Sequence, residues 1–180
     1  MKNEVDILAD VSSKLQSLGI PYMVTGSMAL NYYTQPRLTR DIDIVVLLAA
    51  ADVSRLVGTF AKEYYIAEEA VLTAVRRASI FNLIHTESVI KVDCIVRKDT
   101  EHARTEFDRR QSVVVEGHPT FVVTKEDLIL AKLSWARSSR SEKQLTDVKN
   151  LLSEGYDREY VGQWAKKLDL SGLLDECRNA

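Results

Sequence analysis

The sequence predicts an α/β (α+β) fold: a mixed β-sheet flanked by helices, with a small C-terminal helical region. Three features indicate this class. Short apolar segments typical of strands are interspersed with longer segments whose apolar residues recur at helical spacing. Pairs of strand-like segments are joined by short polar turns. After a polar stretch near residue 138, helical spacing is the only pattern left.

The N-terminal segment is predicted to form a helix, a strand and a second helix. Apolar residues recur at helical spacing over residues 4–18, and a glycine and a proline then end the pattern. Residues 22–25 form a short apolar run typical of a buried strand. A short helix is expected over residues 28–33, with Ser27 near its N-terminus.

The middle of the chain alternates in the same way. An apolar strand is expected over residues 41–48, after a loop that contains a proline. Helices are expected over 52–64, where an aspartate suits the N-cap, and over 68–77. Residues 79–85 and 89–96 flank a polar triplet, which predicts a β-hairpin.

The last strand-like segments precede a helical end. A polar helix is expected over residues 100–110, and 113–115 with 120–123 predict a second strand pair around a glycine. A capping-box-like pattern begins a helix over 124–137. The polar residues 138–141 then connect to helices only.

The chain length limits the domain organisation. With 180 residues, the chain can form one domain or a core with an appendage, but not two large domains. We expect a core over residues 1–137, including the first helix of the C-terminal region, and a helical appendage over 138–180. One compact domain that combines the two is the alternative.

Composition excludes several classes of protein. The formal net charge is −2, from 24 basic and 26 acidic residues, so bulk electrostatics do not favour nucleic-acid binding. Cys94 and Cys177 have no companion at metal-ligand spacing. No apolar run approaches the roughly 20 residues that span a bilayer. We therefore expect a soluble, cytoplasmic protein with no membrane partner.

Three aspartates stand in apolar segments where strands are expected. Asp41 and Asp43 are two residues apart and would share one face of a strand, and Asp93 follows in a later strand. Aspartate is disfavoured in strands, and like charges held together need protonation or cations. Oxygen ligands suit Mg²⁺ or Mn²⁺. The alternative is that these carboxylates pair with Arg37, Arg40 or Lys91, or cap turns.

The dipeptide Gly26-Ser27 lies between an expected strand and an expected helix. Glycine allows close backbone approach, a helix N-terminus presents free N–H groups, and the serine adds a hydroxyl donor. These features suit a phosphate group, although ordinary helix capping is the common use of such a pair. Together with the aspartates downstream, the pattern supplies hydrogen-bond donors for phosphates and carboxylate ligands for the metal ion that accompanies the phosphates.

These residues resemble the signature of the nucleotidyltransferase superfamily, the group with a DNA polymerase β-like catalytic core. That signature is an apolar residue before Gly-Gly or Gly-Ser, then Asp-x-Asp or Asp-x-Glu, and a later aspartate in a strand. Here Val24-Thr25-Gly26-Ser27 precedes Asp41-Ile42-Asp43, with Asp93 as the later acid. The resemblance covers residues 20–96 and implies a nucleotidyltransferase-like sheet.

Within that superfamily, the string Arg37-x-Thr39-x-Asp41-x-Asp43 resembles the AbiEii-type group. This group includes toxins of toxin-antitoxin systems. The segment from Asp127 to Leu133, which contains Lys132, is similar to the group's helical region, as are Ser141 and Asp147 downstream. The match in the helical region is less specific than the match around Asp41 and Asp43. The resemblance to this group implies a toxin with a cognate antitoxin as partner.

The resemblance implies roles for individual residues. Asp41, Asp43 and Asp93 would be catalytic and bind metal ions, with Asp93 also helping to remove a proton from the attacking hydroxyl. Gly26 and Ser27 would hold the β- and γ-phosphates of a nucleoside triphosphate (NTP). Lys132 would reach the triphosphate. Arg37 and Arg40 would balance charge at the rim of this nucleotide-binding site.

The resemblance therefore implies a magnesium-dependent, ATP- or other NTP-using nucleotidyltransferase. Such a transferase moves an NMP group from the NTP to a hydroxyl acceptor on RNA or tRNA, a protein or a small molecule. Two other functions remain open. One is a non-catalytic nucleotide-binding or protein-interaction module of the same fold, and the other is an antibiotic-modifying nucleotidyltransferase. The sequence does not identify the acceptor or the preferred base.

Overall fold

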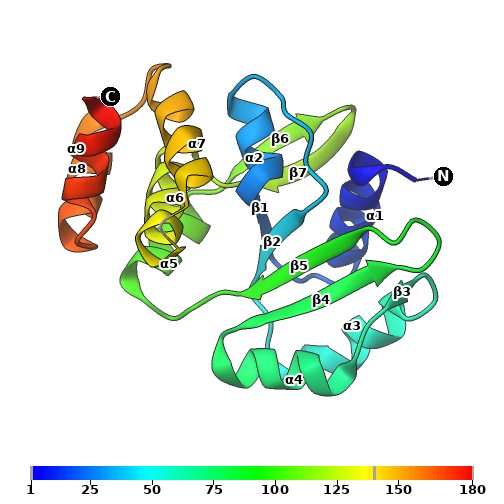
Figure 1. Ribbon diagram of the computed structural model, residues 1–180. Coiled ribbons are helices and arrows are strands. Elements are labelled where there is room, and N and C mark those ends of the chain that lie inside the picture. The colour runs from blue at the N-terminus through cyan, green and yellow to red at the C-terminus, as the bar shows by residue number, and fades with distance from the viewer. Residues whose placement is uncertain (1, 140, 180) are drawn as a thin grey trace.

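The computed structural model describes residues 2–139 and 141–179 (Figure 1). Its centre is a seven-stranded mixed sheet in the order β3-β4-β5-β2-β1-β7-β6. The pairs β2/β5 and β1/β7 are parallel, and the other neighbours are antiparallel. The strands are β1 (Tyr22–Thr25), β2 (Ile42–Val46), β3 (Tyr64–Tyr65), β4 (Ile80–His85), β5 (Lys91–Val96), β6 (Gln111–Val115) and β7 (His118–Val122).

Helices flank this sheet, and the last of them gather at one side of the molecule (Figure 1). This arrangement confirms the predicted fold class. The helices are α1 (Glu4–Ser17), α2 (Gly26–Tyr33), η1 (Ala50–Asp52), α3 (Val53–Phe60), α4 (Glu68–Arg77), α5 (Glu101–Asp108), α6 (Lys125–Ser139), α7 (Glu142–Leu152), α8 (Arg158–Lys167) and α9 (Ser171–Arg178). In the described part of the chain, no helix is both long and apolar enough to cross a membrane.

Strand alternation separates the core from the polar face of the sheet. In β2, the side chains of Ile42, Ile44 and Val46 are buried on one face of the sheet. The helices α1, α3 and α4 cover that face. Asp43 and Val45 point to the opposite face, because successive side chains of a strand alternate. The polar face of β2 therefore carries a carboxylate; α2 contacts this strand, and α6 contacts α2.

The C-terminal helices are joined to the core through α6. Its apolar side chains are buried, and α7, α8 and α9 contact it. A wholly buried carboxylate, Asp127, adds polar ties: it accepts hydrogen bonds from Thr124 Oγ1 (2.6 Å), Arg109 Nε (3.1 Å) and Tyr160 Oη (2.6 Å). The Asp127 backbone N–H in turn donates to Thr124 Oγ1, so the expected helix start at Thr124 is present.

Some predicted boundaries were wrong. The helix expected over 52–64 ends at Phe60, and the chain then forms the short strand β3. Asp52 does not cap α3 with its side chain, which instead accepts from the Ala49 N–H (3.3 Å). The polar connection after residue 137 is also shorter than expected, because α6 continues to Ser139 and α7 begins at Glu142. Arg140, within that connection, lies outside the described residues.

Candidate functional site

The turn from β1 into α2 brings the backbone against a carboxylate. Thr25 lies opposite Asp43 in the antiparallel β1/β2 pair, and Gly26 follows with φ +60°. A Cβ at position 26 would lie 2.8 Å from Asp43 Cγ and overlap its Oδ2. Glycine is therefore required twice, for its left-handed conformation and for this close approach. The start of α2 and the Asp43 carboxylate form one compact site.

The later acid lies beside Asp43, as the sequence predicts. The parallel strands β2 and β5 place Asp43 opposite Asp93, with both side chains half-buried on the polar face. Burial raises the pKa of Asp43, and the neighbouring charges of Asp93 and Asp41 raise it further, against the opposing effect of Lys132 and Lys91. The two strands therefore hold like charges close together.

The other carboxylates are placed less favourably for a ready-made metal site. Asp41 is exposed and precedes β2, which begins at Ile42 rather than at residue 41 as expected. Both oxygens of Asp93 are engaged: Asn82 Nδ2 donates to Oδ1, and Lys91 Nζ lies 3.0 Å from Oδ2. Among residues 2–139 and 141–179, no three His, Cys, Asp or Glu side chains are grouped so that they could hold a metal ion.

The donor set itself fits a divalent cation. Carboxylate oxygens are the ligands that Mg²⁺ prefers, and the charges of Asp41 and Asp93 are unfavourable for ionised Asp43 without a cation. Asp43 supplies carboxylate oxygens on the polar face, and Asp41 lies two residues before it on the exposed loop. Asp93 can act as a ligand once Asn82 and Lys91 release its oxygens.

A second group of charged side chains lies beside the start of α2. Lys132 of α6 is almost fully buried, and its Nζ lies 2.8 Å from Asp147 Oδ2 and 3.0 Å from Gln144 Oε1. Burial lowers the pKa of Lys132, and the ion pair with Asp147 opposes that shift. Arg37 Nη2 donates to the same Asp147 oxygen (3.0 Å) and to Ser27 Oγ (3.1 Å).

These contacts connect four segments of the chain. The loop before β2 supplies Arg37, α2 supplies Ser27, α6 supplies Lys132, and α7 supplies Asp147. Ser27, which accepts from Arg37, directly follows Gly26, and Gly26 lies against Asp43, so the cationic group and Asp43 are neighbours at the start of α2. Arg40, by contrast, is exposed on the loop.

Sequence reasoning missed the importance of three polar side chains. The resemblance includes Asp147 in the helical region without assigning it a role, yet it is buried and pairs with two cations. Its signal was an acid within an apolar helix face, beside Val148 and near Leu151. Gln144 and Asn82 carried no such signal. The pairing of Asp93 with Lys91 was among the alternatives considered.

Comparisons with known proteins agree with the fold. No protein-family model and no curated protein sequence matches the chain. Among solved structures, ANT(2'')-Ia in complex with adenylyl-2''-tobramycin matches with a TM-score of 0.61 at 13% identity, covering 99% of this chain and 98% of that one. The chain has a nucleotidyltransferase-like fold.

Two further structures share the nucleotidyltransferase-like fold. An antigenic nucleotidyltransferase-like protein from Paracoccidioides brasiliensis matches with a TM-score of 0.57 at 18% identity, covering 94% of this chain and 90% of that one. The lincosamide antibiotic adenylyltransferase LnuA, bound to lincomycin, matches with a TM-score of 0.56 at 16% identity, covering 84% of this chain and 97% of that one. At these identities, the likeness concerns the fold.

Proposed function

We propose that this protein transfers an NMP group from an NTP to a hydroxyl acceptor in a reaction that depends on Mg²⁺ or Mn²⁺. The observation that carries the proposal is the approach of the Gly26 backbone to Asp43, with Asp93 alongside. It supports the proposal because backbone N–H groups and carboxylate oxygens, the chemistry that a phosphate and its metal require, lie close together on a nucleotidyltransferase-like fold.

In this proposal each group has a chemical role. Gly26 and Ser27 at the start of α2 bind the β- and γ-phosphates through N–H and hydroxyl groups. Lys132 and Arg37 bind the triphosphate from the other side, while Asp147 holds both cations in place. Asp41 and Asp43 would hold one cation, and Asp93 would hold a second one and accept the proton of the attacking hydroxyl. When bound, divalent cations stabilise the entering and leaving oxygens.

The bonds on Asp93 suggest an order of events. In the structure, Asn82 donates to the Asp93 carboxylate and Lys91 pairs with it. For Asp93 to act as ligand or base, Lys91 must move away, and Lys91 is exposed on β5 with a long flexible side chain. Substrate binding would thus complete the acidic site.

Pyrophosphate release tests the proposal. The protein is incubated with each NTP, Mg²⁺ and RNA, protein or small-molecule acceptors. We expect release with one class of acceptor, with at least a hundredfold loss in Asp43→Asn, because electrostatic stabilisation of this kind is worth factors of that order. Asp108→Asn is the matched control, since Asp108 is exposed on α5. Full release by Asp43→Asn would refute the role of Asp43.

A second candidate function is a nucleotide-binding module without transfer activity. The paired state of Asp93 favours it, because a carboxylate satisfied by Lys91 and Asn82 needs no metal. Calorimetry with an NTP separates the two functions. Binding that is equal with Mg²⁺ and with a chelator, and that yields no product, would identify the module.

The acceptor is a finer question. LnuA is described as a lincosamide antibiotic adenylyltransferase, and ANT(2'')-Ia was solved with adenylyl-2''-tobramycin. Antibiotics of these classes are therefore included among the small-molecule acceptors that are tested. The AbiEii-type resemblance favours RNA or tRNA as acceptor. The possible role as a toxin with a cognate antitoxin stays a prediction. Adenylylation of a lincosamide or an aminoglycoside, measured against labelling of total RNA, distinguishes these acceptors.

A further inference from the structure

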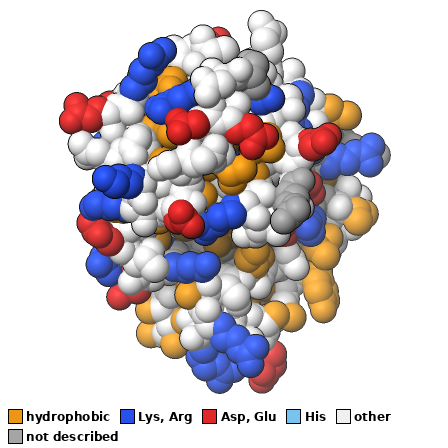
Figure 2. All heavy atoms as spheres, turned by 60° about the vertical axis from the view of Figure 1, so that its left-hand side comes forward, with side chains coloured by type: hydrophobic (Ala, Val, Ile, Leu, Met, Phe, Trp, Pro, Cys, Tyr) orange, Lys and Arg blue, Asp and Glu red, His pale blue; other side chains and the backbone are white. Residues whose placement is uncertain are grey.

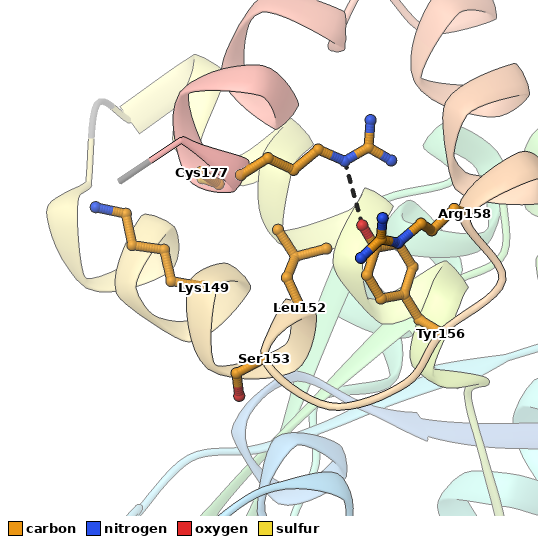
Figure 3. A pocket seen from close by; sticks show the side chains of 7 residues that line it. Lys149, Leu152, Ser153, Tyr156, Arg158 and Cys177 are labelled. Atoms are coloured by element: carbon orange, nitrogen blue, oxygen red, sulfur yellow. Dashed lines mark hydrogen bonds between the residues drawn. The ribbon is translucent and has the colours of Figure 1, made fainter.

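A basic pocket lies in the C-terminal helical region, apart from the candidate active site. It has a volume of about 500 Å³ and lies between α7, the start of α8 and the end of α9. Three cationic side chains, Lys149, Arg158 and Arg178, line it, and none of the aspartate or glutamate side chains within residues 2–139 and 141–179 does. Figure 3 shows Leu152 between Lys149 on one side and Tyr156 with Arg158 on the other.

The positive charges of this pocket are not neutralised by close ion pairs among the described residues. Within residues 2–139 and 141–179, neither Lys149 nor Arg158 forms a salt bridge. Arg178 has only a long contact of 3.8 Å to Asp175, three residues earlier on its own helix. The net charge of the chain is −2, so this concentration of positive charge is local. Figure 2 likewise shows acidic and basic side chains intermixed on the face that it presents.

Tyr156 holds the two arginines in place. Its hydroxyl accepts a hydrogen bond from Arg178 Nε (3.2 Å), and its ring centroid lies 5.9 Å from Arg158 Cζ and 6.0 Å from Arg178 Cζ. Cation–π contact of this kind orients a guanidinium while leaving its remaining N–H groups free. Tyr156 is therefore a positioning residue, and the guanidinium groups are the donors.

The location of Arg158 is not explained by helix stability. It is the first residue of α8, where the helix dipole disfavours a cation, and Asp157 already caps that helix by accepting from the Tyr160 N–H (2.9 Å). A cation at this position instead adds to the positive end of α8 and increases the attraction of the pocket for an anion.

We propose that this pocket binds a phosphate ester. Guanidinium groups match phosphate oxygens with paired N–H donors, and a lysine adds a point charge. The volume exceeds that of a phosphate alone, so it accommodates a phosphate with part of the group that carries it. Free nucleotides and a nucleic-acid backbone both supply this chemistry. The inference does not depend on the proposed transfer reaction, because Lys149 and Asp147 lie two positions apart on α7 and so face different sides of the helix.

Calorimetry measures how tightly phosphate-containing probes bind to the pocket. A chelator is present so that metal-dependent binding at the candidate active site does not contribute. The probes are inorganic phosphate, a nucleoside monophosphate and a short single-stranded RNA. The test variant is Lys149→Gln with Arg158→Gln. The matched control is Lys143→Gln with Lys166→Gln, which removes exposed cations from the same two helices outside the pocket lining.

We expect the test variant to bind about tenfold more weakly per cation removed, since hydrogen bonds to charged groups are worth about that factor. The control variant should bind unchanged. The midpoint of thermal unfolding should not fall in the Arg158→Gln variant, which separates binding from folding. Tighter binding of RNA than of the monophosphate, with affinity falling as salt rises, would indicate a strand as ligand.

The reverse pattern would overturn the proposal. An equal loss in the control variant would mean that net charge, not the pocket, attracts the probe. Absence of binding by the unmodified protein to all three probes would show that the pocket is not a phosphate site. Tyr156→Phe adds a check: it keeps the ring but removes the acceptor for Arg178, and it should weaken binding less than the loss of a cation.

Discussion

At the scale of single residues, Gly26 and Asp43 define the site. The glycine has a positive φ, and its missing side chain leaves room for the Asp43 carboxylate. Neither requirement concerns the hydrophobic core. They bring the start of α2 close to a carboxylate on the polar face of the sheet, and the proposed function rests on this arrangement.

Gly26→Ala should therefore destabilise the protein. The added methyl group collides with Asp43 and the backbone conformation is strained, which we expect to lower the free energy of unfolding by about 1–3 kcal/mol. Urea denaturation measures the change. Gly162→Ala is the control: Gly162 lies within α8 with nothing within 4 Å of an added Cβ, so this variant should gain about 0.5–1 kcal/mol. Equal effects of the two substitutions would contradict the close approach.

Asp43 should also make stability depend on pH. Because its pKa is raised in the folded protein, its ionisation disfavours folding: its contribution to stability is greatest in acid and is lost as pH rises through the raised pKa. In a chelator at neutral pH, Asp43→Asn should therefore raise the unfolding midpoint, and the gain over the unmodified protein should shrink toward acid pH. Thermal unfolding across pH measures this. A variant less stable at neutral pH would contradict the unfavourable charge assigned to Asp43.

At the scale of elements, α7 is tied to the site through a buried ion-pair group. Asp147 serves two cations from different parts of the chain, Arg37 in the loop before β2 and Lys132 on α6. Both Lys132 and Asp147 are almost fully buried, so their interaction is little screened by water. This group fixes the position of α6 and α7 relative to α2.

Removing Asp147 should be more harmful than removing the whole pair. Asp147→Asn leaves Lys132 buried with a weaker partner, and we expect a loss of about 3 kcal/mol in the free energy of unfolding. In Lys132→Met with Asp147→Leu, the buried lysine charge is removed together with its partner, and only the partly exposed Arg37 loses its carboxylate, so the loss should be smaller. Chemical denaturation compares the two. Lys132→Met and Asp147→Leu, each made alone, complete the comparison; if the double variant lost as much as these two together, the pair would not be coupled.

The elements also show how far sequence patterns lead. The two hairpins and the β1-to-α2 turn carry local signals, namely short polar turns and a Gly-Ser pair, and the structure confirms them. The end of α3 had no such signal, because Leu56, Phe60 and Tyr64 continue a helical spacing. Tyr64 is buried all the same, in β3, where it pairs with His85 and donates to Asp10 (2.6 Å).

Parts of the site depend on long-range packing that spacing does not encode. The register of β2 and β5, which pairs Asp43 with Asp93, follows from two strands far apart in the chain. Likewise, the pairing of Lys132 with Asp147 requires the turn between α6 and α7. The motif made the carboxylates recognisable, but only the fold shows that Asp93 already has partners.

At the scale of the whole molecule, a nucleotidyltransferase-like sheet supports two separate charged regions. One is the candidate active site on the polar face, and the other is the basic pocket among the C-terminal helices. The division into a core over 1–137 and an appendage over 138–180 stays a prediction. In either organisation, α6 connects the core with the C-terminal helices, since α2 and α7 both contact it.

The central claim is transfer of the α-phosphoryl group with its nucleoside, and isotope position tests it most directly. With Mg²⁺ and the acceptor found in the screen, label from an α-labelled NTP should enter the acceptor, and label from a γ-labelled NTP should not. Asp43→Asn should abolish incorporation, while Asp108→Asn should retain it. Incorporation from the γ-labelled NTP, or undiminished α-labelling by Asp43→Asn, would contradict the account.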